Sequence, residues 1–370
     1  MTVILRKAAV RLARADAAYF TLGWLMVLLV VGTVAQKFSP APQAARYFFS
    51  SLLLWLGPVP LPGMPVTLGI LALGLLAKLV FSTSWRREHA GVIIAHLGVL
   101  VLLCGGLISA IARQEGTLLL YEGESTCFFS AADECELAIT SAWNTGEHRM
   151  LVYPAAQLRN NTAVSIPGST VSVSVLQLFR DGVLVKRRDA SGRDSGAKRG
   201  LARQFDLRSA QTEEERTQAR PAVVFRIAGA GTDVDGIYLS ADGLEPQPEI
   251  VLRDRLVTIE FQRTRINLAF EIRLVDFSKE VYPQTDIPRF YRSEVVIADE
   301  GKRLAAHVSM NAPLRYRGYV FYQSAFREEA DRQATVLLVV KDRGRWFPYA
   351  ASVLISLGLM IHAGMRRGKP

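Results

Sequence analysis

One ionisable residue lies deep inside a long apolar run of the sequence. His96 is the seventh residue of AGVIIAHLGVLVLLCGGLISAIA, residues 90–112. An imidazole in hydrocarbon is costly unless it has a partner or a ligand, so a histidine at this depth is a candidate functional residue. Imidazole is also a common axial ligand of haem iron. The structural alternative is that the ring hydrogen-bonds a carbonyl of a neighbouring helix.

The other four histidines have less apolar surroundings. His89 precedes His96 by seven residues, two helical turns away on nearly the same face, and lies at a basic boundary. It is a second candidate ligand, with an interfacial residue as the alternative. His362, near the end of the last apolar run, has the same two interpretations. His148 and His307 fall among alternating segments and are expected on the surface of strands.

The cysteines and the short motifs offer little catalytic chemistry. Cys104 lies in an apolar run and is expected to be an inert core thiol. Cys127 and Cys135 fall in a segment expected to be exported, where a disulfide between them is possible but not required. The sequence has no CxxC, HExxH, P-loop or GxSxG motif, and GAGTD at 229–233 has no strand and helix around it. We therefore expect no self-contained active site.

Four apolar runs are long enough to cross the hydrocarbon core of a bilayer. The predicted spans are residues 17–35, 66–82, 90–112 and 347–365. A cleaved signal peptide is the alternative for 17–35, but that run is long for one and Ala35-Gln36-Lys37 is a poor cleavage site. Within the loop 36–65, residues 43–57 are apolar but short and precede several prolines, so an interfacial helix is expected there.

The basic residues predict how these spans are oriented. The formal net charge is +10, and positive residues gather in the flanks 1–16, 83–89 and 366–370. Positive flanks mark the cytoplasmic side, so the two termini and the turn 83–89 are expected there. Residues 36–65 and 113–346 then face outward, into the periplasm if the membrane is a bacterial inner membrane. Because bilayer anchoring accounts for the charge, binding to nucleic acid is not expected.

The long segment 113–346 has the pattern of β structure. Short alternating runs such as TVSVSVLQLF and LVTIEFQ are separated by turn residues, which predicts an antiparallel sheet or sandwich. Residues 180–220 interrupt this pattern and are expected to be a flexible insertion or a short exposed helix. The predicted fold class is therefore a membrane α-helical protein with four transmembrane helices and a large periplasmic, sandwich-like all-β domain.

Several segments, in this order, resemble the ResB/CcsB (ResB-like) family of System II cytochrome c biogenesis. They are HLGVLVLLCGGLIS (96–109) with EGTLLLYEGES (115–125), VDFSKEVYPQTDIPRFYRSEVVI (275–297) and NAPLRYRGYVFYQSAF (311–326). From the residues alone, the alternating Tyr319 and Phe321 are expected to lie in a sandwich core, with a haem-contacting surface as the alternative.

The resemblance implies a haem-handling subunit that acts with a CcsA/ResC-type membrane protein carrying a tryptophan-rich WWD segment. Together they would export haem b and attach it to the CxxCH motifs of apocytochrome c. The family's proposed transmembrane haem ligand matches His96, with His89 as the second choice. The tryptophans of this chain are scattered, so the partner would supply the WWD segment and the second axial ligand.

Two alternatives remain open at this stage. The chain can be a scaffold that binds no haem and whose periplasmic domain stabilises the partner or docks apocytochrome. It can also be a sensor or transporter accessory unrelated to haem. In the leading hypothesis it is at most one subunit of a cytochrome c haem-lyase complex, and a compact exported domain leaves room for a paralogue with another client. The client, the second ligand and the oligomeric state are not given by the sequence.

Overall fold

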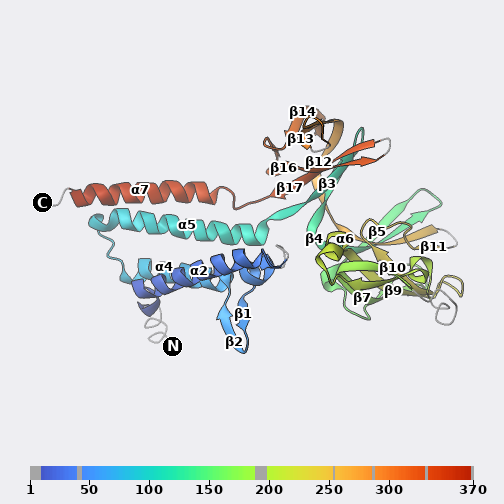
Figure 1. The fold of residues 1–370 in the computed structure, drawn as a ribbon, viewed down its shortest axis with the longest axis horizontal. Helices are drawn as coiled ribbons and strands as arrows, with labels where there is room; N and C mark the ends of the chain where they lie inside the picture. The colour runs from blue at the N-terminus through green and yellow to red at the C-terminus, as the bar shows by residue number, and fades with distance from the viewer. Residues whose placement is uncertain are drawn as a thin grey trace. The chain divides into compact units, whose positions relative to one another are not determined.

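Two compact units make up the chain in the computed structural model. One consists of Met1–Arg113 with Asp342–Pro370, and the other of Gln114–Lys341. The structure describes residues 10–39, 44–187, 198–252, 255–285, 288–329 and 332–367. The first unit holds four helices that are long and apolar enough to cross a membrane, and the second is rich in antiparallel strands (Figure 1). The predicted fold class is confirmed.

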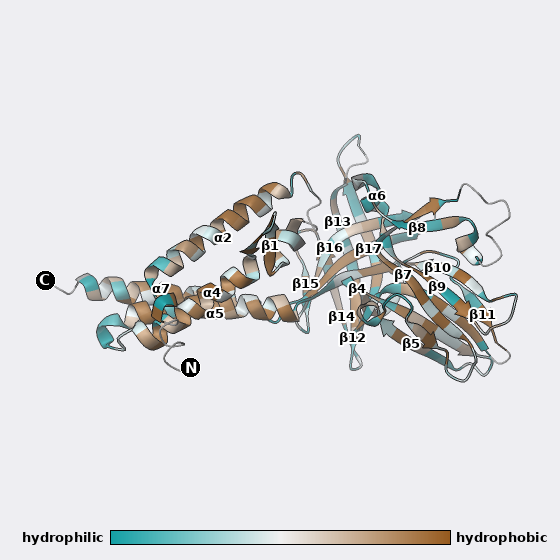
Figure 2. Cartoon of the chain, turned by 90° about the horizontal axis from the view of Figure 1, so that it is seen from below, coloured by the Kyte–Doolittle hydropathy of each residue, from teal (hydrophilic) through white to brown (hydrophobic). Residues whose placement is uncertain are grey.

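The helices of the first unit are coloured predominantly hydrophobic in Figure 2. They are α2 (Ala15–Ala35), α4 (Met64–Ala77), α5 (Ala90–Ala112) and α7 (Phe347–Arg367). A π-helical turn, η2 (Lys78–Ser82), continues α4, and a 3₁₀ turn, η3 (Arg87–His89), precedes α5. A proline in the first turn of α4 costs no hydrogen bond, because the amides there have no intrahelical partner. The basic ends 1–9 and 368–370 lie outside the described residues.

The segment expected to be an interfacial helix is helical only in part. A π-helical turn, η1 (Arg46–Ser50), is followed by an antiparallel hairpin of β1 (Leu53–Leu56) and β2 (Val59–Pro62). Gly57 begins its turn at a φ of +61°, which suits glycine. Prolines at alternate positions end a helix, but a two-stranded hairpin has free edges where missing amide donors are tolerated.

Helices α5 and α7 lie side by side and approach through glycine (Figure 1). Gly91, Gly98 and Gly105 recur every seven residues along one face of α5. A Cβ added to Gly91 would lie 2.4 Å from the backbone nitrogen of His362, and one added to Gly98 would lie 2.9 Å from that of Ile355. Small residues allow this contact between backbones, as they do in membrane helix pairs generally. The contact fixes which face of α5 is turned toward α7.

The second unit is built on one large sheet. Its strand order is β14-β13-β12-β4-β3-β17-β16-β15, with β11 also pairing β12 and β5 also pairing β4. The strands are β3 (Gln114–Tyr121), β4 (Ser125–Trp143), β5 (His148–Pro154), β11 (Glu249–Val251), β12 (Arg255–Val281), β13 (Pro288–Asp299), β14 (Lys302–Ser309), β15 (Leu314–Tyr316), β16 (Tyr319–Glu329) and β17 (Arg332–Lys341). The predicted run LVTIEFQ is part of the longer strand β12, which continues through FEIRLVDFS.

A smaller antiparallel sheet has the order β10-β9-β7-β6, with β8 also pairing β7. Its strands are β6 (Ala163–Ser165), β7 (Ser172–Lys186), β8 (Phe205–Ser209), β9 (Arg220–Ala228) and β10 (Gly236–Ala241). The segment 180–220 therefore contributes the end of β7, all of β8 and a short helix, α6 (Glu213–Gln218). Residues 188–197 of that segment lie outside the described residues.

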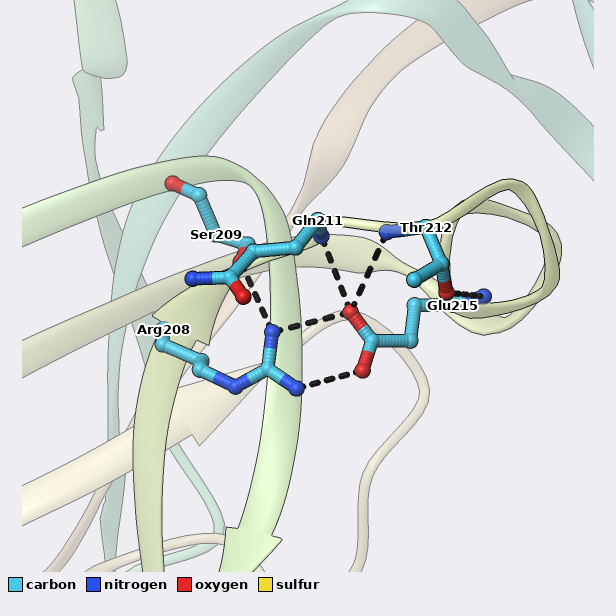
Figure 3. A network of polar contacts seen from close by, with 5 residues as sticks. All are labelled: Arg208, Ser209, Gln211, Thr212 and Glu215. Carbon is cyan, nitrogen blue, oxygen red and sulfur yellow. Dashed lines mark hydrogen bonds and ion pairs between the residues drawn. The ribbon is translucent and has the colours of Figure 1, made fainter.

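An ion pair joins α6 to β8 (Figure 3). The guanidinium of Arg208 donates to both carboxylate oxygens of Glu215, and the backbone amide of Gln211 donates to one of them. These hydrogen bonds, that from Arg208 first, lower the pKa of Glu215 to about 2. Glu215 also completes a capping box with Thr212, so the same carboxylate starts α6 and holds it to the sheet.

Two large hydrophobic cores and a small third cluster of Phe179, Ala222 and Ala241 lie in the described part of this unit. The first lies between the two sheets and includes Leu137, Ile139, Val173, Val175, Phe225, Ile227, Val257, Ile259 and Phe261. The second is enclosed by the other part of the large sheet and includes Leu118, Leu120, Phe129, Phe270, Ile272, Leu274, Ile297, Phe321, Leu337 and Val339. The long strands β4 and β12 contribute side chains to both cores. Tyr319 and Phe321 are buried in the second core, as the alternation in the sequence predicts.

Three buried polar side chains form a hydrogen-bonded triad within the second unit. The Ser293 hydroxyl donates to Oε1 of Gln323 at 2.8 Å, and Nε2 of Gln323 donates to the Thr335 hydroxyl at 2.8 Å. The two hydroxyls are also 2.9 Å apart, so the triad is closed. Ser293 and Thr335 are completely buried and Gln323 nearly so. Because each group has a partner, the triad links β13, β16 and β17 without the cost of a buried orphan.

The turn between β15 and β16 is bound to the turn between β13 and β14 by ion pairs. Arg317 and Gly318 between β15 and β16 both have positive φ, as in a two-residue hairpin turn. Nε of Arg317 lies 2.6 Å from Oδ2 of Asp299, and its Nη2 donates to Glu300 in the β13–β14 turn. The Tyr316 hydroxyl donates to the same Asp299 oxygen at 2.6 Å, which raises the pKa of Tyr316. The edge strands are thereby held together by charge.

The structure excludes an intramolecular disulfide. Cys127 and Cys135 both lie on β4, and all three cysteines are free. Cys135 pairs with Arg263 of β12 and Phe128 pairs with Asn267, so the two cysteines lie opposite parts of β12 at least four residues, or about 13 Å, apart. A disulfide requires Cα atoms within about 7 Å of each other.

Replacing Gly98 with alanine tests the contact between α5 and α7. The added methyl meets the backbone of α7, so we expect a loss of about 1–3 kcal/mol in the free energy of unfolding. Gly106 on the same helix has open space around it and is the matched control, where alanine is expected to be neutral or slightly stabilising. Thermal unfolding in detergent micelles measures both variants. Equal melting temperatures for G98A and G106A would contradict this packing.

Gln323→Leu tests the buried triad. The leucine leaves the hydroxyls of Ser293 and Thr335 short of a partner, so we expect the β domain to lose about 1–3 kcal/mol. Gln333→Leu, on the adjacent strand β17 at a half-buried position, is the control and is expected to change stability little. Circular dichroism of the β signal during heating is the measurement. A triad with no structural role predicts the same midpoint for the two variants.

A cavity around His96

The orientation of His96 follows from the packing of α5. At 100° per residue, His96 is turned about 140° away from Gly91, whose face contacts α7. Its side chain is half-buried, and it lines a cavity together with residues of α2 and α4. The ring therefore points away from α7, into the other half of the helix bundle.

The cavity has a volume of about 270 Å³. Its walls are the first turns of α2 with the residues that precede it, the last turns of α4, and His96 with Val99 on α5. Most lining residues are aliphatic, and the polar ones are Arg14, Tyr19, Thr21, Lys78 and His96. The Thr21 hydroxyl donates to the Ala17 carbonyl within its own helix at 2.7 Å. The groups left to meet a ligand are thus an imidazole, a phenol and two cations.

One nitrogen of the His96 ring is already engaged. Nδ1 lies 2.6 Å from the carbonyl oxygen of Val92, four residues earlier on α5. A carbonyl can only accept, so Nδ1 carries the proton, and in the neutral ring Nε2 then holds a free lone pair. Histidines that bind metals are usually oriented in this way, with the second nitrogen donating to a carbonyl. The hydrogen-bond partner is the histidine's own helix, not a neighbouring one.

The two cations of the cavity differ in their partners. Nη2 of Arg14 lies 3.1 Å from Oδ2 of Asp16, and both side chains are largely exposed. Lys78 is half-buried, and within the described part of the chain its ammonium has no acceptor or carboxylate partner. Its backbone is fixed, because the Lys78 carbonyl accepts from both the amide and the hydroxyl of Thr83.

The other histidines are placed elsewhere. His89 caps α5 from an exposed position without a side-chain hydrogen bond to the helix end, and it does not line the cavity. His362 is half-buried on α7, where its backbone faces Gly91. His148 and His307 are exposed on β5 and β14, as expected. Among the five, the structure places His96 alone beside the cavity.

Sequence reasoning overlooked two of the cavity's polar residues. Lys78 falls within the predicted span 66–82 and Arg14 within the basic flank 1–16, and neither was singled out as a candidate. The available signal was an ionisable residue within the apolar run 66–82, but which helix it faces depends on packing. Elsewhere, no group of three or more His, Cys, Asp or Glu residues that could hold a metal occurs among the described residues.

Comparisons with known proteins point to one family. Residues 252–332 match the model of the ResB-like family. They begin just before β12 and end at the start of β17, so the match covers much of the second core of the β domain. The chain is also similar to Protein NrfI of Wolinella succinogenes, with 24% identity over 351 residues. That alignment takes in 93% of this chain but only 34% of NrfI. The resemblance to the ResB-like family is confirmed.

The ring of His96 provides a test of the site that needs no ligand. With Nδ1 bonded to the Val92 carbonyl, the neutral ring is expected to be protonated at Nδ1 and unprotonated at Nε2. Solid-state ¹⁵N spectra of histidine-labelled protein in lipid distinguish the two nitrogens, and His96→Gln assigns the signal. A ring protonated at Nε2 alone would contradict the hydrogen bond and remove the free lone pair.

Proposed function

We propose that this chain is a haem-handling subunit of a cytochrome c maturation system, in which His96 is an axial ligand of the haem iron. The observation that carries the proposal is the cavity beside His96, where Nδ1 is bound to Val92 and Nε2 is left free. The match to the ResB-like family and the similarity to NrfI support a role in cytochrome c biogenesis.

The residues around the cavity suit a haem. A porphyrin brings four nitrogen ligands of its own, so one imidazole is enough to hold its iron from one side. Aliphatic residues of α2 and α4 fit the apolar macrocycle, and Lys78 and Arg14 fit its charged edge. The bound haem would be the cargo that is later joined to a cytochrome, and this chain's part is to bind and orient it.

The size of the cavity supports the proposal of a second subunit. Pockets that enclose ligands of drug size have about 300–1,000 Å³, and the 270 Å³ beside His96 lies below this range. A flat macrocycle would therefore be held here along one part only. We propose that a CcsA/ResC-type partner completes the pocket and supplies the second axial ligand and the tryptophan-rich segment.

The charge distribution supports an orientation in a bacterial inner membrane. His96 lies six residues after the start of α5, about 9 Å along its axis, close to the basic turn that contains Arg86 and Arg87. Positive flanks favour the cytoplasm for this end and for both termini, and the periplasm for the β domain. Haem would then enter from the cytoplasmic side and leave toward the periplasm, where it would be attached to apocytochrome c.

One observation favours a second candidate function. The family match covers 252–332 in the β domain and does not reach α5. A scaffold whose β domain stabilises the partner or docks apocytochrome, without touching haem, would explain a match confined to that domain. The two functions differ in whether the haem content of the complex depends on His96.

Purification of variant complexes decides between them. In the complex with the WWD partner, His96→Ala is expected to lower the haem that copurifies by about tenfold or more, because a ligand to iron is lost. Imidazole in the buffer should restore part of the Soret absorbance. His89→Ala, outside the cavity, is the control that should keep its haem.

The scaffold function predicts another outcome. The haem spectrum would then be the same in wild type and His96→Ala, while assembly with the partner would be intact. Measuring the ratio of partner to chain in each preparation separates loss of haem from loss of the complex.

A further inference from the structure

We infer that Lys78 and Arg14, which both line the His96 cavity, form a carboxylate-binding subsite that orients the ligand of that cavity. The inference rests on the proposed function and adds to it the direction in which the macrocycle lies. Lys78 begins η2 and Arg14 is the residue before α2, and both line the same space as the histidine. None of them belongs to the segment that matches the family model.

The first argument is the unpaired charge of Lys78. Its side chain is half-buried within a candidate membrane span, and in the described chain its ammonium meets no acceptor. An ionisable group at such a position is costly unless it pairs or reaches water, and it commonly marks a ligand path. The space next to Lys78 is the cavity itself, so an anionic ligand there would supply the missing partner.

The second argument is that the backbone around Lys78 is built to hold it in place. The Lys78 carbonyl accepts from the Thr83 hydroxyl at 2.9 Å, and Nε1 of Trp85 donates to the Leu79 carbonyl at 3.0 Å. These bonds fix the π-helical turn that begins at Lys78, and such turns are frequent at functional sites. At Gly74, one turn earlier, an added Cβ would lie 3.1 Å from the Leu12 carbonyl, so the segment just before α2 lies close to this turn.

The third argument is the balance of charge. Arg14 pairs with Asp16, but their side chains are 69% and 65% exposed, so water weakens that pair. Lys78, Arg14 and Asp16 together leave one net positive charge at this end of the cavity. An ammonium and a guanidinium both bind carboxylates with charge-assisted hydrogen bonds.

These features fit the chemistry of haem b. Its two propionates leave the macrocycle from one edge, while the rest of the ring is apolar. With the iron at His96, the propionate edge would turn toward Lys78 and Arg14, and the apolar edge toward the interior of the bundle. A lipid phosphate shares the anionic chemistry of a propionate, so the experiment must separate the two.

Haem and its dimethyl ester, which has no free carboxylate, provide the test. The full chain is purified with its WWD partner from haem-depleted cells and placed in phosphatidylcholine nanodiscs. Each compound is titrated while the Soret band is recorded. We expect wild type to bind haem about tenfold more tightly than the ester, since a charged hydrogen bond is lost with the ester. Lys78→Met should abolish the preference and Lys78→Arg should keep it, with Arg86→Gln as a control outside the cavity.

Three results would overturn the inference. If Lys78→Met keeps the preference for haem while His96→Ala loses the Soret shift, the proposed function stands and the subsite fails. If Lys78→Met changes only the response to added phosphatidylglycerol, the residue binds lipid phosphate. If wild type binds neither compound, the proposed function fails and the subsite fails with it. The melting temperature of each complex shows that the variants are folded.

Discussion

The contact between α5 and α7 through glycine determines how the helical unit can work. Where two backbones touch at Gly91 and Gly98, neither helix can rotate without a clash. This contact fixes the rotation of α5 about its axis. As a result, His96 faces α2 and α4. The Nδ1 bond to Val92 removes the remaining freedom of the ring. A helix with larger residues at these positions could carry the same histidine and present it to lipid.

The polar groups of the bundle are distributed in a way that suits an incomplete site. His96 is satisfied on one nitrogen and open on the other, and within the described residues Lys78 has a charge and no partner. The cavity between them is smaller than a macrocycle requires. In the β unit the Ser293, Gln323 and Thr335 side chains satisfy one another in a buried triad. The helices thus leave an imidazole nitrogen and an ammonium for another molecule to meet.

Much of this arrangement could be predicted from the sequence, because it depends on local patterns. Hydropathy gave the four helices, alternation gave the strands, and an imidazole in an apolar run indicated His96. Other features depend on what packs against what. The prolines after residue 57 indicate the end of a helix. That the segment forms a hairpin depends on the pairing of β1 with β2. The distance between Cys127 and Cys135 depended on their sharing one strand. The role of Lys78 in lining the cavity depended on how closely the residues just before α2 approach Gly74.

The central claim is that His96 binds iron through Nε2, in a pocket shared with a second subunit. The most direct measurement is a cryo-electron microscopy structure of the haem-loaded complex with its WWD partner in lipid. The account predicts density for the iron within coordination distance of His96 Nε2, with the macrocycle between α2, α4 and the partner. A haem held by other residues, or a His96 ring that faces lipid, would contradict it.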